Sequence, residues 1–519
     1  MKKETEYGII HETKSERTDK QMNKNYTANM QATEAFRNNM AFCIGTGRMG
    51  LALQEEYQQQ MRLVQDEIGF SHIRGHGLFC DDVGIYWPVT DWKGNVLEDG
   101  YYNFTYLDRI MDNYLKVGLK PFLELGFMPS KMASGTQTLF YWKGNTTPPK
   151  DYDKWAALIK ALLNHLCERY GADEVATWPV EVWNEPNLPG FWENADLQEY
   201  LKLYDVSVAA VKEVLPQMRV GGPAVCGGSR CMEFITTFLD HCRDNKVPLD
   251  FVTRHIYMGQ EPQRDKRYLY HEMCRPEKSI KEAEETRQVI DSYPEFKGFE
   301  LHITEYNTSY NPFCPTHDTV YNAALIAGLL AKLGDTCASY SYWTFGDVFE
   351  EGGVPERIFH GGFGLVANGL VRKPTYWTFE FFKKLEGSLI LRQEDCLFVQ
   401  TDKGHIRGVM WNFENEEINM KVELPGLKGK WGMVSRKVDM DNGNPLKIWH
   451  EMGEPASLTE TQLKLLRQSD MPHTSACSLE GENGICIEKT MMANAVVYVE
   501  LTPFKEETTP GYRYPGICE

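Results

Sequence analysis

The sequence has little positive charge, no long apolar segment and no paired cysteine motif. Its 55 lysine and arginine residues are outnumbered by 73 aspartate and glutamate residues, which gives a formal net charge of −18. Nucleic acids and anionic membrane surfaces both require a basic face on the protein, so neither is expected as a partner. A neutral or cationic small ligand fits this composition better.

Signals for targeting, membrane insertion and metal binding are also missing. Residues 1–6 are polar and no run of about 18 apolar residues occurs, so we expect no signal peptide and predict a soluble, cytoplasmic protein. The 13 cysteines are scattered. Cys226 and Cys231 come closest to a metal motif, but they lack a second pair or a histidine couple. We therefore expect reduced, mostly buried thiols and no metal site.

The length of the chain and the change in its sequence patterns predict a large domain followed by a smaller one. With 519 residues, 42% of them hydrophobic, the chain exceeds the usual size of one core. Residues 1–39 are polar and predict a surface arm, in which a short strand at 8–11 can join the second domain. We expect a catalytic domain over 40–386, and an accessory domain over 387–519 that ends in an extended tail from 508.

Strand and helix patterns alternate through the larger predicted domain. The expected strands are 40–45, 70–76, 119–125, 176–182, 218–223, 250–257, 299–305 and 339–345. Helical patterns lie between them, for example at 105–117 and 152–169. Eight alternations predict a (β/α)₈ TIM barrel, with a doubly wound open sheet as the alternative. After residue 387, short alternating runs such as 396–400 and 406–412 predict an antiparallel β-sandwich.

The stretch Trp183-Asn184-Glu185-Pro186 closes the fourth predicted strand. Pro186 has no amide hydrogen for a strand ladder, so the amide and the carboxylate lie at the carboxyl end of the strand. Ligands bind at this end of parallel strands. Burial beside tryptophan disfavours a charged carboxylate, as a proton donor near neutral pH requires. The alternative is a purely structural Asn-Glu pair at a strand end.

A second carboxylate, Glu305, ends the seventh predicted strand. In a closed barrel the fourth and seventh strands face each other across the mouth, which brings Glu305 opposite Glu185. Cleavage of a glycosidic bond needs two such groups: an acid that protonates the leaving oxygen, and an anion that meets the positive charge at the anomeric carbon.

Other strand ends also carry polar or aromatic groups. His255 and Tyr257 share one face of the sixth strand, where the phenol can donate a hydrogen bond to Glu305. His76 closes the second strand, with Asp81 and Asp82 in the loop that follows. Trp343, near the end of the eighth strand, offers a flat apolar surface for a sugar. A single histidine at a strand end is more often structural. Polar or aromatic groups at the ends of five strands together favour a functional site.

Together these motifs resemble the β-xylosidases of glycoside hydrolase family 39. The segments that carry the resemblance are 43–48, 74–78, 183–187, 255–257, 304–306 and 342–351. It covers about residues 40–505 and implies a barrel with a β-sandwich, no cofactor, and a homo-oligomer, since bacterial members are often tetramers. It also implies that Glu185 is the general acid/base and Glu305 the nucleophile. The residues implied to bind the terminal sugar are His76, Asn184, His255, Tyr257, Trp343, Glu350 and Glu351.

The expected function is therefore a retaining exo-β-1,4-xylosidase that acts on short xylo-oligosaccharides. The near alternatives are an α-L-arabinosidase and an α-L-iduronidase. An iduronidase needs cationic groups for its substrate carboxylate, and Glu350 and Glu351 have the wrong sign. A carbohydrate-binding protein without turnover is the alternative of another class, and the presence of both carboxylates argues against it. The polar arm before residue 39 is longer than the resemblance requires. This difference concerns the packing or assembly of the protein and not its chemistry.

Overall fold

Eight parallel strands close into a barrel in the computed structural model, which describes residues 22–504. In chain order they are β2 (Cys43–Arg48), β3 (His72–His76), β6 (Lys120–Leu125), β9 (Val180–Val182), β10 (Val220–Val225), β11 (Phe251–Tyr257), β14 (Glu300–Asn307) and β15 (Ser339–Tyr342). Strand β15 pairs with β2 and completes the ring. The predicted TIM barrel is confirmed, and the open sheet is wrong because the eight barrel strands form a closed ring.

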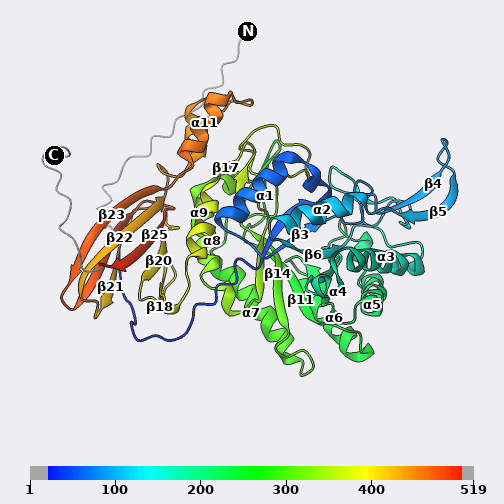
Figure 1. Ribbon diagram of the computed structural model, residues 1–519, viewed down its shortest axis with the longest axis horizontal. Helices are drawn as coiled ribbons and strands as arrows, with labels where there is room; N and C mark the ends of the chain where they lie inside the picture. Colours follow the sequence, from blue (N-terminus) through cyan, green and yellow to red (C-terminus); the bar gives the residue numbers. More distant parts are fainter. Residues whose placement is uncertain (1–21, 505–519) are drawn as a thin grey trace, which may run out of the picture.

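Helices surround the barrel (Figure 1). They are α1 (Glu55–Glu67), α2 (Thr105–Lys116), α3 (Tyr152–Tyr170), α4 (Ala172–Val175), α5 (Leu197–Val214), α6 (Cys231–Asn245), α7 (Pro276–Ser292), α8 (Val320–Leu330) and α9 (Pro374–Lys383). Helix α3 buries a stripe of apolar side chains that includes Trp155, Leu158 and Leu162, whereas α8 is buried on nearly all sides. Asp151 caps α3 by accepting hydrogen bonds from the backbone of Asp153 and Lys154.

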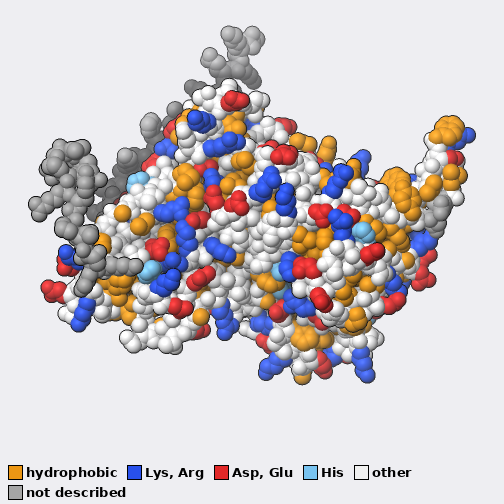
Figure 2. All heavy atoms as spheres, in the orientation of Figure 1, with side chains coloured by type: hydrophobic (Ala, Val, Ile, Leu, Met, Phe, Trp, Pro, Cys, Tyr) orange, Lys and Arg blue, Asp and Glu red, His pale blue; other side chains and the backbone are white. Residues whose placement is uncertain are grey.

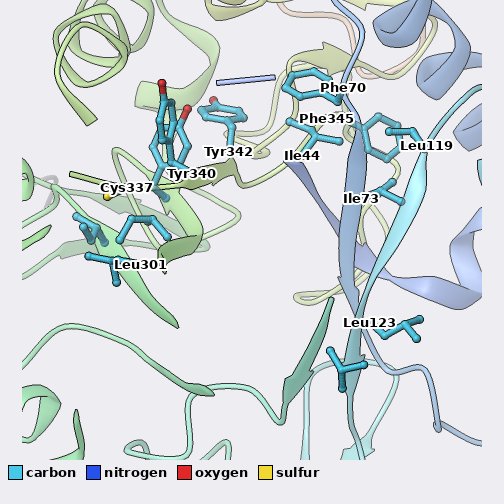
Figure 3. Packing of buried hydrophobic residues seen from close by; sticks show 14 of the residues in the cluster. Ile44, Phe70, Ile73, Leu119, Leu123, Leu301, Cys337, Tyr340, Tyr342 and Phe345 are labelled. Carbon is cyan, nitrogen blue, oxygen red and sulfur yellow. The ribbon is translucent and has the colours of Figure 1, made fainter. Parts of the chain in front are cut away.

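The apolar core lies between this ring of helices and the strands. Figure 3 shows part of it, with Ile44, Ile73 and Leu301 from barrel strands beside Tyr340 and Tyr342 from β15. These five side chains are at most 1% exposed. A core packed in this way holds the carboxyl ends of the strands in fixed positions.

The fourth predicted strand is much shorter than expected. The pattern at 176–182 predicts seven strand residues, but β9 contains only Val180–Val182. The preceding residues form α4 and a turn, in which the backbone N–H of Trp178 donates to Val175 O and its indole N–H donates to Glu174. These local hydrogen bonds keep Trp178 out of the sheet, although its side chain is fully buried.

A second unit is built from two packed sheets. Six antiparallel strands lie in the order β18 (Ser388–Arg392), β19 (Cys396–Gln400), β20 (Ile406–Trp411), β25 (Val496–Pro503), β22 (Gly429–Val438) and β23 (His473–Gly481). The other sheet holds β1 (Met22–Thr27), β21 (Ile418–Pro425) and β24 (Gly484–Met491). Alternate side chains of β21 are buried, and they pack in one cluster with Phe398, Met410 and Val499.

The amino-terminal segment contributes to this second unit. Strand β1 pairs with β21 in parallel, while β21 and β24 are antiparallel. The three-stranded sheet is therefore mixed, unlike the purely antiparallel sandwich predicted from the sequence. The strand expected at 8–11 and the tail expected from 508 lie outside the described residues.

Two helices that the sequence patterns do not predict interrupt the second unit between β22 and β23. They are α10 (Pro445–Glu451) and α11 (Glu460–Ser469), and they pack against a loop of the barrel (Figure 1). Trp449 and Leu466 from these helices share a small core with Ile358 and Phe359 of that loop.

The remaining short elements lie in loops. They are β4 (Tyr86–Thr90), β5 (Val96–Tyr102), β7 (Thr138–Leu139), β8 (Gly144–Asn145), β12 (Gln263–Asp265), β13 (Tyr268–Tyr270), β16 (Val366–Ala367), β17 (Val371–Arg372), and the 3₁₀ helices Met49–Leu53, Glu193–Ala195, Pro315–Asp318 and Leu333–Asp335. The hairpin of β4 and β5 projects from the barrel, and hydrophobic side chains cover its tip (Figures 1 and 2). Between residues 22 and 504, no helix is long and apolar enough to cross a bilayer.

Candidate active site

A cavity of about 1030 Å³ opens at the carboxyl ends of the barrel strands. The side chains at its closed end are nearly all buried, and they come from strands that are far apart in the sequence. These residues are His76, Asn184, Glu185, Tyr257, Glu305, Trp343 and Glu351. All of them were candidate site residues on sequence grounds, and the structure brings them together. His255 contacts Glu185 at the same end of the cavity, and its side chain has no exposed surface.

Glu185 follows β9 in a left-handed backbone conformation. Its φ angle is 48°, and that of Trp183 is 70°, a region that side chains other than glycine rarely adopt. The backbone N–H of Glu185 donates to Ala224 O, which holds this conformation. His255 Nδ1 lies 2.8 Å from Glu185 Oε1 and fixes the rotation of the carboxyl group. Backbone strain of this kind is typical of functional sites and aims the side chain into the cavity.

Glu305 lies on β14 and is surrounded by groups that favour its ionised form. Arg74 Nη1 donates to its Oε1 at 2.5 Å, and the Tyr257 hydroxyl donates to its Oε2 at 2.7 Å. His76 Nε2 lies 3.4 Å from Oε1. Burial and the nearby Glu305 charge raise the pKa of the Tyr257 phenol well above its usual value, so it remains a donor.

The two carboxyl groups face each other at short range. One carboxylate oxygen of Glu185, one of Glu305 and a ring nitrogen of His255 all lie within 4.8 Å of one another. Burial, then the charge of Glu305, raises the pKa of Glu185 well above its usual value. Burial also raises the pKa of Glu305, but Arg74, His76 and the Tyr257 hydrogen bond oppose this effect. We conclude that Glu185 holds the proton of the pair and that Glu305 is the anion.

Sequence reasoning missed the charged groups beneath these carboxylates. Arg74 is fully buried and donates through Nε to Glu181 at 2.8 Å and through Nη2 to Asn184 Oδ1 at 2.8 Å. The same Nη2 lies 2.9 Å from Glu124, whose other partner is His76 Nδ1 at 2.7 Å. Period-two spacing could have indicated Arg74, because it lies two residues before His76 on one strand and therefore on the same face.

Asn184 retains an unused donor that lines the cavity. Its Oδ1 accepts from Arg74, whereas its buried Nδ2 has no hydrogen-bond partner in the described part of the chain. A buried amide donor without a partner is costly, so a ligand hydroxyl is the natural acceptor for it. Trp343, 2% exposed, packs its ring 4.6 Å from that of His76 and forms an apolar wall.

The two neighbouring glutamates in the loop after β15 have different environments. Glu351 lines the cavity, and burial together with the charges of Glu305 and Glu185 raises its pKa well above the usual value. Its carboxyl group is therefore a hydrogen-bond donor as well as an acceptor near neutral pH. Glu350 does not line the cavity: its Oε2 accepts from Arg48 Nη2 at 2.6 Å.

A metal ion has one set of candidate ligands among the described residues, namely Glu185, His255 and Glu305. Burial, followed by the positive charge of Arg74, lowers the pKa of His255 well below its usual value. The same guanidinium of Arg74, in contact with Glu305, disfavours a divalent cation in this place by repulsion. The donor set fits one protonated and one ionised carboxyl group better than it fits metal binding.

Comparison with known proteins places this geometry in a family. The sequence model of "Glycosyl hydrolases family 39" matches residues 27–484. A β-xylosidase of Geobacillus stearothermophilus is 45% identical over 485 residues, which cover 92% of this chain and 95% of that protein. A β-xylosidase of Caldicellulosiruptor saccharolyticus is 34% identical over 479 residues, which cover 89% of this chain and 94% of that one.

Solved structures lead to the same family. A crystal structure of a monomeric β-xylosidase from Caulobacter crescentus CB15 has a TM-score of 0.84 and 32% sequence identity, covering 93% of this chain and all of that chain.

Proposed function

Because the chain belongs to glycosyl hydrolase family 39, we propose that it is a retaining exo-β-1,4-xylosidase that releases xylose from the non-reducing end of short xylo-oligosaccharides. The observation that carries this proposal is the pair Glu185 and Glu305, whose oxygens lie within 4.8 Å of each other at the closed end of the cavity. Retaining glycosidases place their two carboxyl groups about 5–5.5 Å apart, whereas inverting enzymes need about 6.5–9.5 Å to admit a water.

In the first step, Glu305 attacks the anomeric carbon of the terminal xylose. A bond forms between the Glu305 oxygen and this carbon, the glycosidic bond breaks, and the proton of Glu185 passes to the leaving oxygen. Arg74 and Tyr257 hold Glu305 ionised for this attack. Burial keeps Glu185 protonated at the pH at which Glu305 is an anion.

In the second step, Glu185 acts as a base. Its carboxylate takes a proton from water, the water oxygen bonds to the anomeric carbon, and the bond to Glu305 breaks. Loss of the product leaves Glu185 protonated and Glu305 ionised, ready for another cycle. The anomeric carbon is inverted twice, so the released xylose has the β configuration.

Exo-action follows from the closed end of the cavity. The residues His76, Trp343 and Glu351 close the barrel side of the site, so we propose that only a chain end can enter. We further propose that Asn184 Nδ2 and Glu351 bind hydroxyls of the terminal sugar, and that Trp343 stacks on its apolar face. His255 orients Glu185 from below.

Turnover of aryl glycosides tests this function directly. The purified protein should hydrolyse 4-nitrophenyl β-xyloside, and proton NMR before mutarotation should show β-xylose first. A slowly turned-over 2-fluoro xyloside should label the peptide that contains Glu305. First-formed α-xylose would refute the double displacement, and no hydrolysis of any glycoside would favour a binding protein without turnover.

Related substrates are the second candidate within the same chemistry. α-L-Arabinosides should be tested beside β-xylosides, because the two sugars differ little in size. Uronic acids at the terminal position are disfavoured, since the cation at the closed end, Arg74, is already shared by Glu181, Glu124 and Glu305. Faster turnover of an aryl α-L-iduronide than of the β-xyloside would reverse this assignment.

We also propose a cytoplasmic location and a homo-oligomeric assembly. The described cysteines are all free thiols, which is typical of a reducing compartment. The projecting hairpin exposes Trp92, Val96 and Leu97 by 89%, 57% and 68%, and apolar groups of this kind favour a protein contact. Cell fractionation tests the location, and light scattering after gel filtration tests the assembly. A monomer, as described for the Caulobacter relative, would contradict the assembly.

A further inference from the structure

The cavity extends well beyond the space that one terminal sugar needs. Pockets of about 300–1,000 Å³ hold whole drug-sized ligands, and this cavity reaches about 1030 Å³. We call the part of the cavity that is lined by more exposed side chains the outer cavity. It is lined by Arg264, Arg267, Lys278, Tyr310, Phe313 and Glu356. None of these side chains is used in the two chemical steps.

The outer cavity is rich in cations, although the chain as a whole is acidic. Lys278 Nζ lies 2.9 Å from Glu282, and Arg267 Nη1 lies 2.9 Å from Glu356. Glu356 is a weak partner, because its side chain is 74% exposed to water.

Arg264 is the cation without a carboxylate partner among the described residues. It is exposed on β12, and its hydrogen bond, at 3.5 Å, goes to the backbone oxygen of Lys266. In a protein of net charge −18, an unpaired guanidinium on the wall of a substrate cavity is available to bind an anion.

Aromatic rings stand beside these cations. The guanidinium carbon of Arg267 lies 4.5 Å from the ring centre of Phe313, which orients the guanidinium by a cation–π contact. Tyr310 is 48% exposed in the same part of the cavity. Flat rings next to planar guanidinium groups are suited to a ring that bears a carboxylate, because stacking and a charged hydrogen bond can act together.

We propose that the outer cavity binds a carboxylate on the leaving group, so that the enzyme prefers acidic β-xylosides to neutral ones. The chemical class is a xyloside whose leaving group carries a carboxylate, as in a xylo-oligosaccharide substituted with a uronic acid. Arg264 is the principal contact, and Arg267 becomes a second one when the carboxylate displaces Glu356. This proposal rests on the proposed xylosidase function and specifies its leaving-group side.

The test compares 4-carboxyphenyl β-xyloside with 4-carbamoylphenyl β-xyloside, which have similar shape but differ in charge. The quantity measured is the ratio of kcat/KM for the acidic substrate to that for the neutral one. Differences in leaving-group reactivity cancel when this ratio is compared between variants. Arg264→Gln should lower the ratio about two- to five-fold, the usual effect of one partly exposed charge pair. Glu356→Gln should raise it by a similar factor, because it frees Arg267.

Lys266 provides the matched control. It is an exposed cation two residues from Arg264, but it does not line the cavity. Lys266→Gln should leave the ratio within experimental error of the wild type, which shows that net charge alone is not responsible. Added sodium chloride should lower the wild-type ratio by screening and should change the Arg264→Gln ratio less.

The outcomes separate this proposal from the function on which it rests. If the wild type cleaves neither aryl xyloside, the xylosidase proposal itself fails. If both substrates are cleaved but the ratio is the same for wild type, Arg264→Gln and Glu356→Gln, the carboxylate site is refuted and the xylosidase proposal stands. Opposite shifts in the two variants, with no shift in Lys266→Gln, support the site.

Discussion

Replacement of Arg74 by methionine removes the guanidinium that contacts Glu305, and it should move the acid limb of the pH–rate profile toward neutral pH. Arg74 Nη1 lies 2.5 Å from Glu305 Oε1, and neither side chain is more than 5% exposed. Two unit charges about 4 Å apart, centre to centre, interact by about 4 kcal/mol at an effective dielectric constant of about 20. Since about 1.36 kcal/mol corresponds to a factor of ten in an equilibrium constant, removal of Arg74 should raise the pKa of Glu305 and increase its proton affinity by about a thousand-fold.

The sign of the effect on activity follows from the proposed role of Glu305 as the nucleophile. The nucleophile must be ionised, so kcat/KM falls as the pH drops below the pKa of Glu305 in the free enzyme. When the proton affinity of Glu305 rises by about a thousand-fold, about a thousand-fold less of the anion is present at pH values below the wild-type pKa, and the deficit narrows as the pH rises toward the new pKa. The variant should therefore lose activity most strongly on the acid side and recover part of it as the pH rises.

The assay is kcat/KM for 4-nitrophenyl β-xyloside between about pH 4 and pH 9, because this activated leaving group needs little help from Glu185. Arg74→Lys is the matched variant: it keeps the charge, so its acid limb should stay near that of the wild type, although lysine lacks the fork that contacts Glu181 and Asn184 together. Thermal melts show whether each variant is folded. An Arg74→Met enzyme that is folded and has the wild-type acid limb would refute the role of Arg74.

Three further predictions address other residues. Glu185→Gln should slow cleavage of poor leaving groups about 10²–10⁴-fold. Added azide should restore turnover with β-xylosyl azide as the product, and absence of this product would contradict the acid/base role of Glu185. Glu351→Ala should raise KM about five- to a hundred-fold by removing a buried hydrogen bond, whereas Glu350→Ala, beside Arg48, should change KM much less; equal effects would contradict this division. Lys373→Met should lower the free energy of unfolding by about 3–5 kcal/mol in urea titrations, since Lys373 Nζ lies 2.6 Å from both Asp318 and Asp347. A loss below about 1 kcal/mol would show that this buried pairing contributes little to stability.

The barrel and its acidic strand ends could be predicted because they depend on local patterns. Apolar periodicity marks helices such as α3, and a polar residue directly after an apolar strand marks the ligand-binding edge. Glu185 and Glu305 follow from this rule. Sequence patterns failed where hydrogen bonds override the strand preference of a residue, as at Trp178, which a turn with Val175 and Glu174 keeps out of the sheet although its side chain is buried.

The helices α10 and α11 and the position of Glu350 could not be predicted for a similar reason. Both helices are short and have few buried residues, and their stability comes from packing against Ile358 and Phe359 of a distant loop. The sequence places Glu350 and Glu351 side by side, and only the fold shows that Arg48 binds the first of them.

The distribution of charge at the closed end of the cavity requires the three-dimensional structure. Buried carboxyl groups gather there around the guanidinium of Arg74, and they belong to Glu124, Glu181, Glu185 and Glu305. Glu351, whose side chain is 10% exposed, lies beside them, 3.8 Å from His76. One positive charge cannot balance five negative ones in a buried site, so some of these groups must retain protons. The contacts decide which: Glu305 touches Arg74 and Tyr257, whereas burial and neighbouring carboxylates raise the pKa of Glu185 and Glu351. In the proposed mechanism the nucleophile is the carboxylate that contacts Arg74, and residue types along the chain cannot show that contact.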